Sequence, residues 1–166
     1  MLIELVPRLW KPAPPPIRAL ADEAAWWASY LEDEWERYGR RYERRLLDAA
    51  LAALAVLPRT QGEPVLLNQD LHAENVLAAQ REPWLVIDPK PLAGEREFAA
   101  SPIVRSGVLG HSRRDLLYRF DRVTAQLGLD RERARGWTIA QALAWSGGWD
   151  YWPDDVQNAR RLLDAL

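Results

Sequence analysis

Two stretches near the middle of the chain decide the fold: VLLNQDLHAENVL at residues 65–77 and WLVIDPKPLAGEREF at residues 84–98. In both, short apolar runs alternate with turn-forming residues instead of repeating at helical spacing. The runs predict strands at residues 65–67, 76–77 and 84–87, with a turn at residues 80–83. We therefore expect a small β element whose loops carry a group of polar side chains.

Three of these polar side chains suit phosphoryl transfer. Asp70 and Asn75 form a D-x-x-x-x-N pattern just after the first strand, and Asp88 ends the third. Such a reaction needs a carboxylate to accept a proton from the attacking hydroxyl, a role for Asp70, and hard oxygen ligands for Mg²⁺, a role for Asn75 and Asp88. The alternative is a plain turn in which Asp70 and Asn75 cap local backbone groups.

Helical patterns surround the β element. Apolar residues at three- and four-residue steps predict helices over residues 17–38 and 42–57, separated at Gly39. Further helices are predicted from Ser112 to Leu127, from Asp130 to Ser146, and from Pro153 to the C-terminus. A short apolar segment over residues 2–10 leads into an extended connector at residues 12–16, and a loop is expected over residues 89–102, because prolines interrupt both of the latter. The expected fold is α+β, mainly α, with residues 1–166 forming one domain.

Composition excludes several classes of protein. The 166 residues have a formal net charge of -2 and contain no cysteine. General nucleic-acid binding, a disulfide scaffold and a thiolate zinc site are therefore not expected. The N-terminus does not have the pattern of a signal peptide, and the longest apolar run is too short to cross a membrane. We expect a cytoplasmic protein with no membrane or nucleic-acid partner.

The letters QDLHAENVL and WLVIDPKPLAGEREF resemble the aminoglycoside/hydroxyurea antibiotic resistance kinases of the streptomycin 6-phosphotransferase type, within the protein-kinase-like superfamily. Weaker similarity covers RLWKP and GLDRERARGWT, so that nearly the whole chain is similar to the C-terminal lobe of that family. The resemblance implies a kinase-like lobe whose small β element carries the catalytic loop. It also implies Asp70 as catalytic base, Asn75 and Asp88 as Mg²⁺ ligands, and ATP as donor to a hydroxyl of an aminoglycoside-like acceptor.

The sequence departs from the family pattern in three places. Asn68 and Gln69 stand where related phosphotransferases carry His-Gly, and Ala99 stands where an acid is expected. No glycine-rich phosphate loop precedes the site, so we expect the N-terminal nucleotide lobe to be absent and the chain to be a truncated kinase, inactive alone. The apolar surface that such a lobe would cover should favour self-association or an N-terminal-lobe partner.

Other residues near the motif have two interpretations each. His72 is included among the predicted cofactor-binding residues, as a group that orients the loop or contacts phosphate, with a structural histidine as the alternative. Lys90 can approach the phosphates or remain a solvated surface lysine. Glu95 can contribute to the metal or acceptor site or lie on a loop surface, and His111 is expected in a loop.

The predicted acceptor site lies near the C-terminus, because a cationic sugar requires carboxylates and flat apolar faces. Asp150, Asp154 and Trp149 are the predicted substrate residues, in a segment that also holds Trp145, Trp152 and Asp155. The alternative is that these acids only begin a helix, where its dipole favours negative charge. Most of the nine tryptophans are expected in the core.

Two other functions compete with the kinase interpretation. A metallophosphoesterase could use Asp70, His72, Asn75 and Asp88 as ligands, although two-metal sites usually draw on more histidines than the two in this chain. A non-catalytic remnant or binding module of the same fold would keep these residues without phosphoryl transfer.

Overall fold

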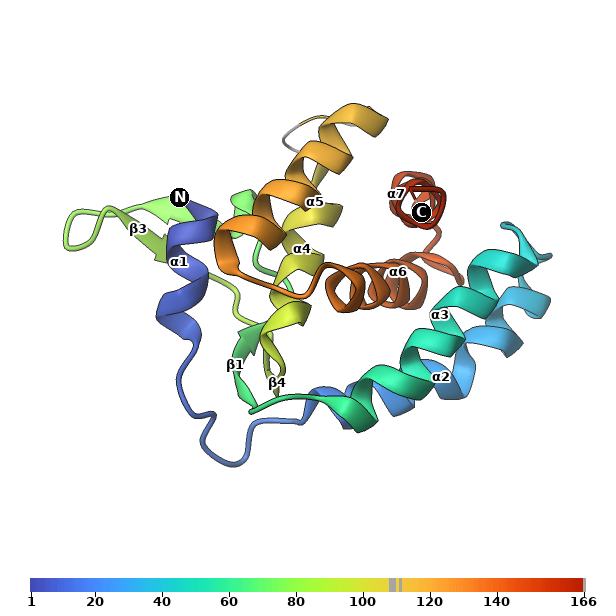
Figure 1. The fold of residues 1–166 in the computed structure, drawn as a ribbon, viewed down its shortest axis with the longest axis horizontal. Coiled ribbons are helices and arrows are strands. Elements are labelled where there is room, and N and C mark those ends of the chain that lie inside the picture. Colours follow the sequence, from blue (N-terminus) through green and yellow to red (C-terminus); the bar gives the residue numbers. More distant parts are fainter. Residues whose placement is uncertain (108–109, 111, 166) are drawn as a thin grey trace.

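The computed structural model describes residues 1–107, 110 and 112–165, so the expected loop position of His111 lies outside the described residues. The helices are α1 (Leu2–Leu9), α2 (Leu20–Arg37), α3 (Arg44–Val56), α4 (Ala100–Arg105), α5 (Arg113–Leu127), α6 (Arg131–Ser146) and α7 (Pro153–Leu163). The strands are β1 (Val65–Asn68), β2 (Val76–Ala78), β3 (Trp84–Val86) and β4 (Pro91–Gly94). The fold is mainly helical with small antiparallel sheets, which agrees with the expected α+β class (Figure 1).

Helix α6 lies at the centre of the helical part and packs against α3, α4 and α7 (Figure 1). The largest buried side chains meet there. Phe98 lies between Trp27 of α2 and Trp137 of α6, with ring centroids 6.2 Å and 5.7 Å away. All three are fully buried, and burying such large apolar surfaces is the main force that holds the helices together.

The β element consists of two separate antiparallel pairs. Strand β1 pairs with β4, and β2 pairs with β3 in a hairpin that projects beside α1 (Figure 1). The predicted loop over residues 89–102 is therefore wrong, since it contains β4 and the first half of α4. Pro91 is compatible with β4 because it is the first residue of the strand. Gly94 ends the strand against α2, where an added Cβ would lie 2.5 Å from Leu20 Cβ.

The short apolar segment at the N-terminus, for which no helix was predicted, is helical. Residues 2–9 form α1, which buries Leu2, Leu5 and Val6 on one side. Packing of this apolar side outweighs the presence of Pro7 within so short a helix. The proline-rich residues that follow are non-helical, as predicted.

The predicted helix ends are confirmed where side chains or glycine form caps. Ser112 accepts a hydrogen bond from the backbone N–H of Asp115 at the start of α5, and Gly128 ends that helix at φ +64°. Asp130 accepts hydrogen bonds from the N–H groups of Glu132 and Arg133 at the start of α6. These are local interactions, so local sequence is sufficient to place them.

The expectation that most tryptophans lie in the core is wrong. Trp27, Trp35 and Trp137 are buried, whereas Trp26, Trp84, Trp149 and Trp152 are exposed and Trp10 and Trp145 are partly buried. Helical spacing indicated that indoles pack, but adjacent residues such as Trp26 and Trp27 point to different sides of α2. The exposed indoles are therefore available to line surface hollows.

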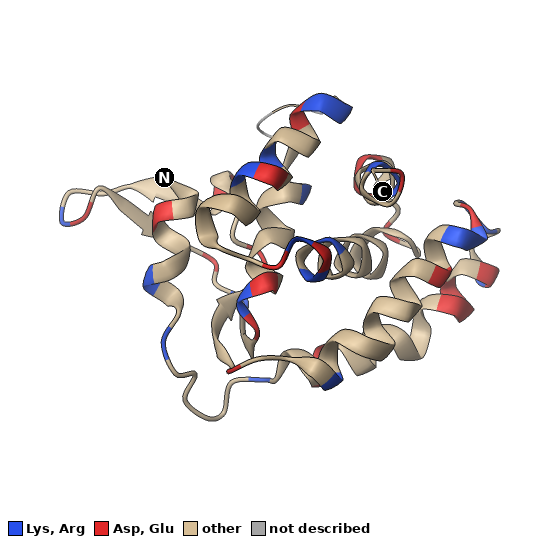
Figure 2. Ribbon diagram, viewed as in Figure 1, with Lys and Arg blue, Asp and Glu red and all other residues tan. Residues whose placement is uncertain are grey.

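Charges of both signs alternate along α1 and α5 (Figure 2). This interspersed distribution agrees with the formal net charge of only -2. Within the described residues, no helix is both long and apolar enough to span a bilayer.

Candidate active site

The candidate active site is built on the loop between β1 and β2. Asn68, the last residue of β1, is buried, and its Oδ1 accepts hydrogen bonds from the backbone N–H groups of Asp70 and Lys90, both at 3.1 Å. The N–H of Gln69 donates to the carbonyl of Lys90 at 3.0 Å. The side chain of Asn68 therefore connects the two stretches that carry the motif, residues 65–77 and residues 84–98.

Helix α6 contacts the same loop through a buried side chain. Gln141 donates from Nε2 to the carbonyl of Gln69 at 2.8 Å, and its Oε1 accepts a hydrogen bond from Ser101 Oγ at 2.6 Å. Both Gln141 and Ser101 are fully buried. These contacts, with those of Asn68, anchor the loop that carries Asn68 and Gln69 in place of His-Gly. The signal for Gln141 was its polar side chain within the apolar run of α6, and our sequence analysis missed it.

The carboxylate of Asp70 lies between two basic side chains. Lys90 Nζ is 2.6 Å from Oδ2, and His72 Nε2 is 3.5 Å from Oδ1. The Asp70 side chain is 17% exposed, so most of its surface is covered. Lys90 is thus in contact with Asp70 and is not merely a solvated surface lysine.

Asn75 makes the local contact that the plain-turn alternative predicts. Its Nδ2 donates to the carbonyl of Asp70 at 2.9 Å and lies 3.2 Å from His72 Nε2. His72 is therefore a hydrogen-bonded residue of the loop, as the structural alternative for it expected, and it also lines the cavity described below.

Asp88 follows Ile87, whose backbone is hydrogen-bonded to that of Asn75. The N–H of Ile87 donates to the carbonyl of Asn75 at 3.0 Å. Asp88 itself has φ +45°, a left-handed conformation that L-residues other than Asn and Asp rarely adopt, and it precedes Pro89. Sparsely populated backbone conformations persist where the surrounding structure holds them, and they concentrate at functional sites.

A cavity of about 760 Å³ opens beside Asp70. Its described lining includes six carboxylates, against one lysine, one arginine and one histidine: Glu23, Asp70, Glu74, Asp150, Asp154, Asp155, Lys90, Arg105 and His72. Trp26, Trp145 and Trp152 add flat apolar faces. The cavity therefore combines negative charge with aromatic surface.

The predicted substrate residues divide between two hollows. Asp150 and Asp154 line the cavity of Asp70, as do Trp145, Trp152 and Asp155. Trp149 lines a neighbouring hollow of about 390 Å³, which it shares with Asp150 and Trp26. The structure thus brings Asp70, His72, Asp150 and Asp154 together, whereas Asn75, Asp88 and Trp149 lie outside the lining of that cavity.

Trp145 lies between two cations on the cavity wall. Lys90 Nζ is 5.2 Å from its ring centroid, and Arg105 Cζ is 4.9 Å away. Arg105 Nη2 is 2.6 Å from Asp155 Oδ2, which also accepts a hydrogen bond from Ser146 Oγ at 2.7 Å. A continuous series of polar and aromatic contacts therefore connects Asp70 to the start of α7.

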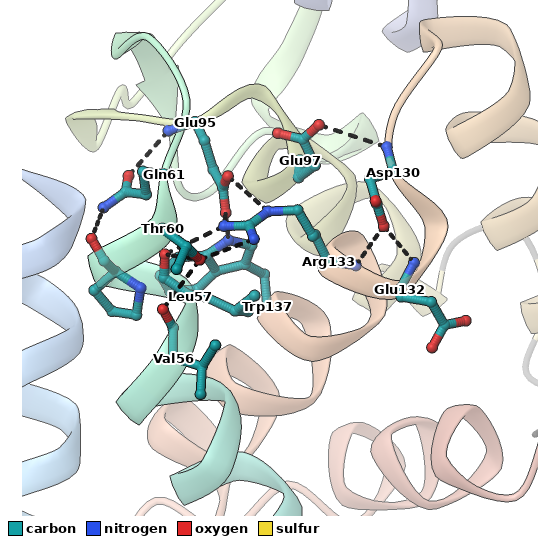
Figure 3. Close-up of polar contacts among 11 residues, drawn as sticks. Val56, Leu57, Thr60, Gln61, Glu95, Glu97, Asp130, Glu132, Arg133 and Trp137 are labelled. Atoms are coloured by element: carbon teal, nitrogen blue, oxygen red, sulfur yellow. Dashed lines mark hydrogen bonds and ion pairs between the residues drawn. The ribbon is translucent and has the colours of Figure 1, made fainter.

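Glu95 belongs to the core and not to the metal or acceptor site. Its buried carboxylate accepts hydrogen bonds from Arg133 Nε and Nη2, at 2.9 Å and 2.8 Å, and from Trp137 Nε1. Figure 3 shows this carboxylate pointing to α6, together with the contact of its backbone N–H to Gln61. The carboxylate raises the pKa of Arg133 through these hydrogen bonds. Both alternatives considered for Glu95, site residue and loop surface, are thus wrong.

The donors near the loop suit a cation that keeps several non-protein ligands. Asn75 and Asp88 supply an amide oxygen and a carboxylate, and Mg²⁺ usually takes one or two protein oxygens beside phosphate oxygens and water. Within residues 1–107, 110 and 112–165, no group of three or more His, Asp or Glu side chains is placed to hold a metal ion. The metallophosphoesterase alternative expected such a group.

Comparison with known proteins extends over most of the chain. The sequence model of the aminoglycoside/hydroxyurea antibiotic resistance kinases matches residues 1–152. A hydroxyurea phosphotransferase of Kitasatospora aureofaciens is 44% identical over 131 residues, which are 79% of this chain and 37% of that protein. A streptomycin 6-kinase of Streptomyces griseus is 41% identical over 137 residues, 80% of this chain and 44% of that protein.

A more distant relative is a streptomycin 3''-kinase of Klebsiella pneumoniae, 36% identical over 110 residues, which are 60% of this chain and 40% of that protein. The chain thus spans less than half of the length of each of these relatives. The family match over residues 1–152, together with relatives that are 44% and 41% identical, shows that the chain belongs to the aminoglycoside/hydroxyurea antibiotic resistance kinase family.

Proposed function

We propose that these 166 residues form one domain, the kinase-like catalytic and acceptor-binding lobe of an ATP-dependent phosphotransferase that acts on a hydroxyl of an aminoglycoside-like molecule. The observation that carries this proposal is the position of Asp70. Its carboxylate lines a cavity of about 760 Å³ together with five other carboxylates and three indoles. Such a cavity suits a cationic sugar whose hydroxyl must approach a base.

The residues of the loop take distinct roles. Asp70 accepts the proton of the attacking hydroxyl, as phosphoryl transfer requires. Asn75 and Asp88 hold Mg²⁺, which neutralises charge on the phosphates of ATP. His72 orients the loop through Asn75 and faces the nucleotide phosphates across the cavity. The backbone link between Ile87 and Asn75 supports the common site of the two metal ligands.

The acceptor occupies the wall formed by α6, α7 and the residues between them. Asp150 and Asp154 attract its cationic groups, and Trp152 supplies an apolar face. Trp149 contacts parts of a larger acceptor that reach the neighbouring hollow. The printed names of the relatives, which include streptomycin kinases, support an aminoglycoside acceptor.

Turnover by these residues alone should be slow. The 166 residues contain no glycine-rich phosphate loop, and a cavity open to water weakens each charge interaction with ATP. Leu77 and Leu85, which pair across the β2–β3 hairpin and so share one of its faces, are about half exposed, at 49% and 53%. This apolar face suits a further copy of the chain or a nucleotide-binding lobe that covers it.

The test is to incubate the 166-residue chain with Mg²⁺, ATP and streptomycin and to measure phosphorylated product by mass spectrometry. We expect product that depends on Asp70, at a turnover below about 0.01 s⁻¹, where ordinary enzymes begin near 1 s⁻¹. The control is the Asp70→Ala variant.

Two outcomes would contradict parts of the proposal. Equal product formation by the unmodified chain and by Asp70→Ala would show that Asp70 is not the catalytic base and would favour the non-catalytic binding module. Asp70-dependent turnover at ordinary enzyme rates would show that the chain needs no additional nucleotide-binding part.

A further inference from the structure

Lys90 occupies an unusual position for an exposed side chain. Its Nζ is 2.6 Å from Asp70 Oδ2 and 5.2 Å from the ring centroid of Trp145, while the side chain remains 45% exposed. Its backbone is fixed on both sides, by the N–H contact to Asn68 and by the carbonyl contact to Gln69. Pro89 and Pro91 flank it. The backbone is therefore held in place while the four-carbon side chain retains freedom to move.

The arginine on the cavity, Arg105, is held differently. Its ion pair with Asp155 is largely buried, with side chains 12% and 16% exposed. The two carboxylates are about equally buried, with 17% of Asp70 and 16% of Asp155 exposed, but a buried cation that loses its partner is left uncompensated, whereas Lys90, 45% exposed, remains solvated by water. Among the lysine and arginine side chains of the described lining, Lys90 is therefore the cation that an incoming anion can attract at low cost.

An incoming phosphate needs such a cation. Six carboxylates line the cavity, and together they repel the oxygens of a polyphosphate. The ammonium of Lys90 also occupies Asp70 Oδ2, one of the two oxygens that can accept the proton of the acceptor. Movement of Lys90 from the carboxylate to a phosphate would remove both obstacles in a single step.

We propose that Lys90 is a catalytic residue whose ammonium leaves Asp70 and binds the transferred phosphoryl group. The inference rests on the proposed phosphotransferase function. The acceptor oxygen forms a bond to the γ-phosphorus, its proton passes to the freed Oδ2 of Asp70, and the bond to the bridging oxygen breaks so that ADP leaves with the electron pair. Lys90 keeps its protons throughout and neutralises charge on the phosphoryl oxygens.

The composition of the chain agrees with this role. Of its 22 basic residues only Lys11 and Lys90 are lysines. Arginine would hold Asp70 through two parallel hydrogen bonds in a rigid fork, whereas lysine is a compact charge with three rotatable donors. The residue type at position 90 thus favours exchange between two anionic partners.

The rarity of lysine permits a direct measurement. In the full chain with ¹⁵N-labelled lysine, the side-chain ammonium groups of Lys11 and Lys90 give two NMR signals, assigned with the Lys11→Arg and Lys90→Arg variants. The probe is inorganic triphosphate with Mg²⁺, which needs no adenine pocket. We expect the Lys90 signal to shift saturably while the Lys11 signal does not. Sodium chloride at equal ionic strength controls for screening, and the Asp88→Asn variant should weaken the response at least tenfold.

An unchanged Lys90 signal, or a shift that sodium chloride reproduces, would overturn the inference. The second readout is Asp70-dependent product. Lys90→Gln should lower the turnover at least tenfold with little change in the KM for streptomycin, and Lys90→Arg should restore part of it. Equal turnover in Lys90→Gln and the unmodified chain would also overturn the inference.

The two proposals fail separately. A Lys90 signal that responds to triphosphate in a chain with no Asp70-dependent product would leave the phosphate site standing and contradict the phosphotransferase function. Asp70-dependent product in a chain whose Lys90 signal does not respond to triphosphate would support the phosphotransferase function and contradict the role of Lys90.

Discussion

Gln141 of α6 donates a hydrogen bond to the backbone carbonyl of Gln69, 72 positions earlier in the chain, at 2.8 Å. This contact joins the centre of the helical core to the residue just before Asp70. Gln141 is fully buried, and its amide oxygen accepts a hydrogen bond from Ser101. Because both ends of its amide group are hydrogen-bonded, Gln141 holds the loop in a fixed position against α6.

Gln141→Leu tests this connection. The substitution leaves Ser101 Oγ and the carbonyl of Gln69 without their partner, so we expect a loss of about 1–3 kcal/mol in the free energy of unfolding in urea. Amide hydrogen exchange at Gln69 and Asp70 should become faster. Gln126→Leu, at an exposed position of α5, is the matched control and should change neither quantity appreciably. Unchanged exchange at Asp70 in Gln141→Leu would show that the loop is held by Asn68 alone.

The ion pair of Glu95 and Arg133 should be among the more important polar contacts for stability. Glu95→Gln keeps the shape of the side chain but leaves the charge of Arg133 uncompensated, so we expect a loss of about 3 kcal/mol in the free energy of unfolding. The control is Asp121→Asn, which breaks an exposed pair with Arg131 and should cost below about 1 kcal/mol. Equal losses in the two variants would mean that burial adds nothing to the Glu95 pair.

Acid should weaken the contact between α3 and α7. Arg160 donates two hydrogen bonds to Glu43, both at 2.7 Å, and they lower the pKa of Glu43 from its ordinary value of 4.5 to about 2. Since this pKa is lower in the folded chain than in the unfolded chain, the pair stabilises the fold fully above pH 4.5 and loses this contribution as the pH falls toward 2.

The Glu43 side chain is 42% exposed, so solvent screening limits the effect to about 1 kcal/mol. Urea unfolding from pH 6 to about pH 2 measures it, as the difference between the unmodified chain and Glu43→Gln. This difference should shrink on acidification, and a difference that grows would contradict the assignment.

Asp150 and Asp154 should determine how tightly a cationic acceptor binds. Changing both to asparagine removes two charges from the cavity wall, and we expect about tenfold weaker binding of streptomycin by calorimetry, with a smaller dependence on salt. The control variant changes Asp33 and Asp48, exposed acids of α2 and α3, and alters the net charge equally. If both double variants bind streptomycin as tightly as the unmodified chain, the two acids serve only the beginning of α7.

Sequence was a reliable guide where the determining interactions are local. Ser112, Gly128 and Asp130 fix the ends of α5 and α6 through contacts within a few residues, and these predictions are confirmed. The strand at residues 65–67 is confirmed as part of β1, since its run of branched apolar residues favours a strand. The motif itself also led to the family, which the comparisons confirm.

The missed features depend on partners distant in sequence. Strand β4 contains Pro91 and Gly94, both typical of loops, and exists because it pairs with β1, from Asn68↔Pro91 to Val65↔Gly94, residues more than 20 positions apart in the chain. The contacts of Gln141 with Gln69, and of Lys90 with Asp70, arise only once the helices and strands are packed. The roles assigned to Asp70, Asn75 and Asp88 stay predictions.

Mn²⁺, a paramagnetic substitute for Mg²⁺, tests the central claim most directly by locating the metal–nucleotide complex. In amide NMR spectra of the full chain with ATP, traces of Mn²⁺ should broaden the signals of Asn75, Ile87 and Asp88 first, and the Asp88→Asn variant should lose this effect. Broadening centred on Asp150, Asp154 and Asp155, equal in the unmodified chain and in Asp88→Asn, would place the metal at the acidic wall and contradict the assignment of the phosphoryl-transfer site.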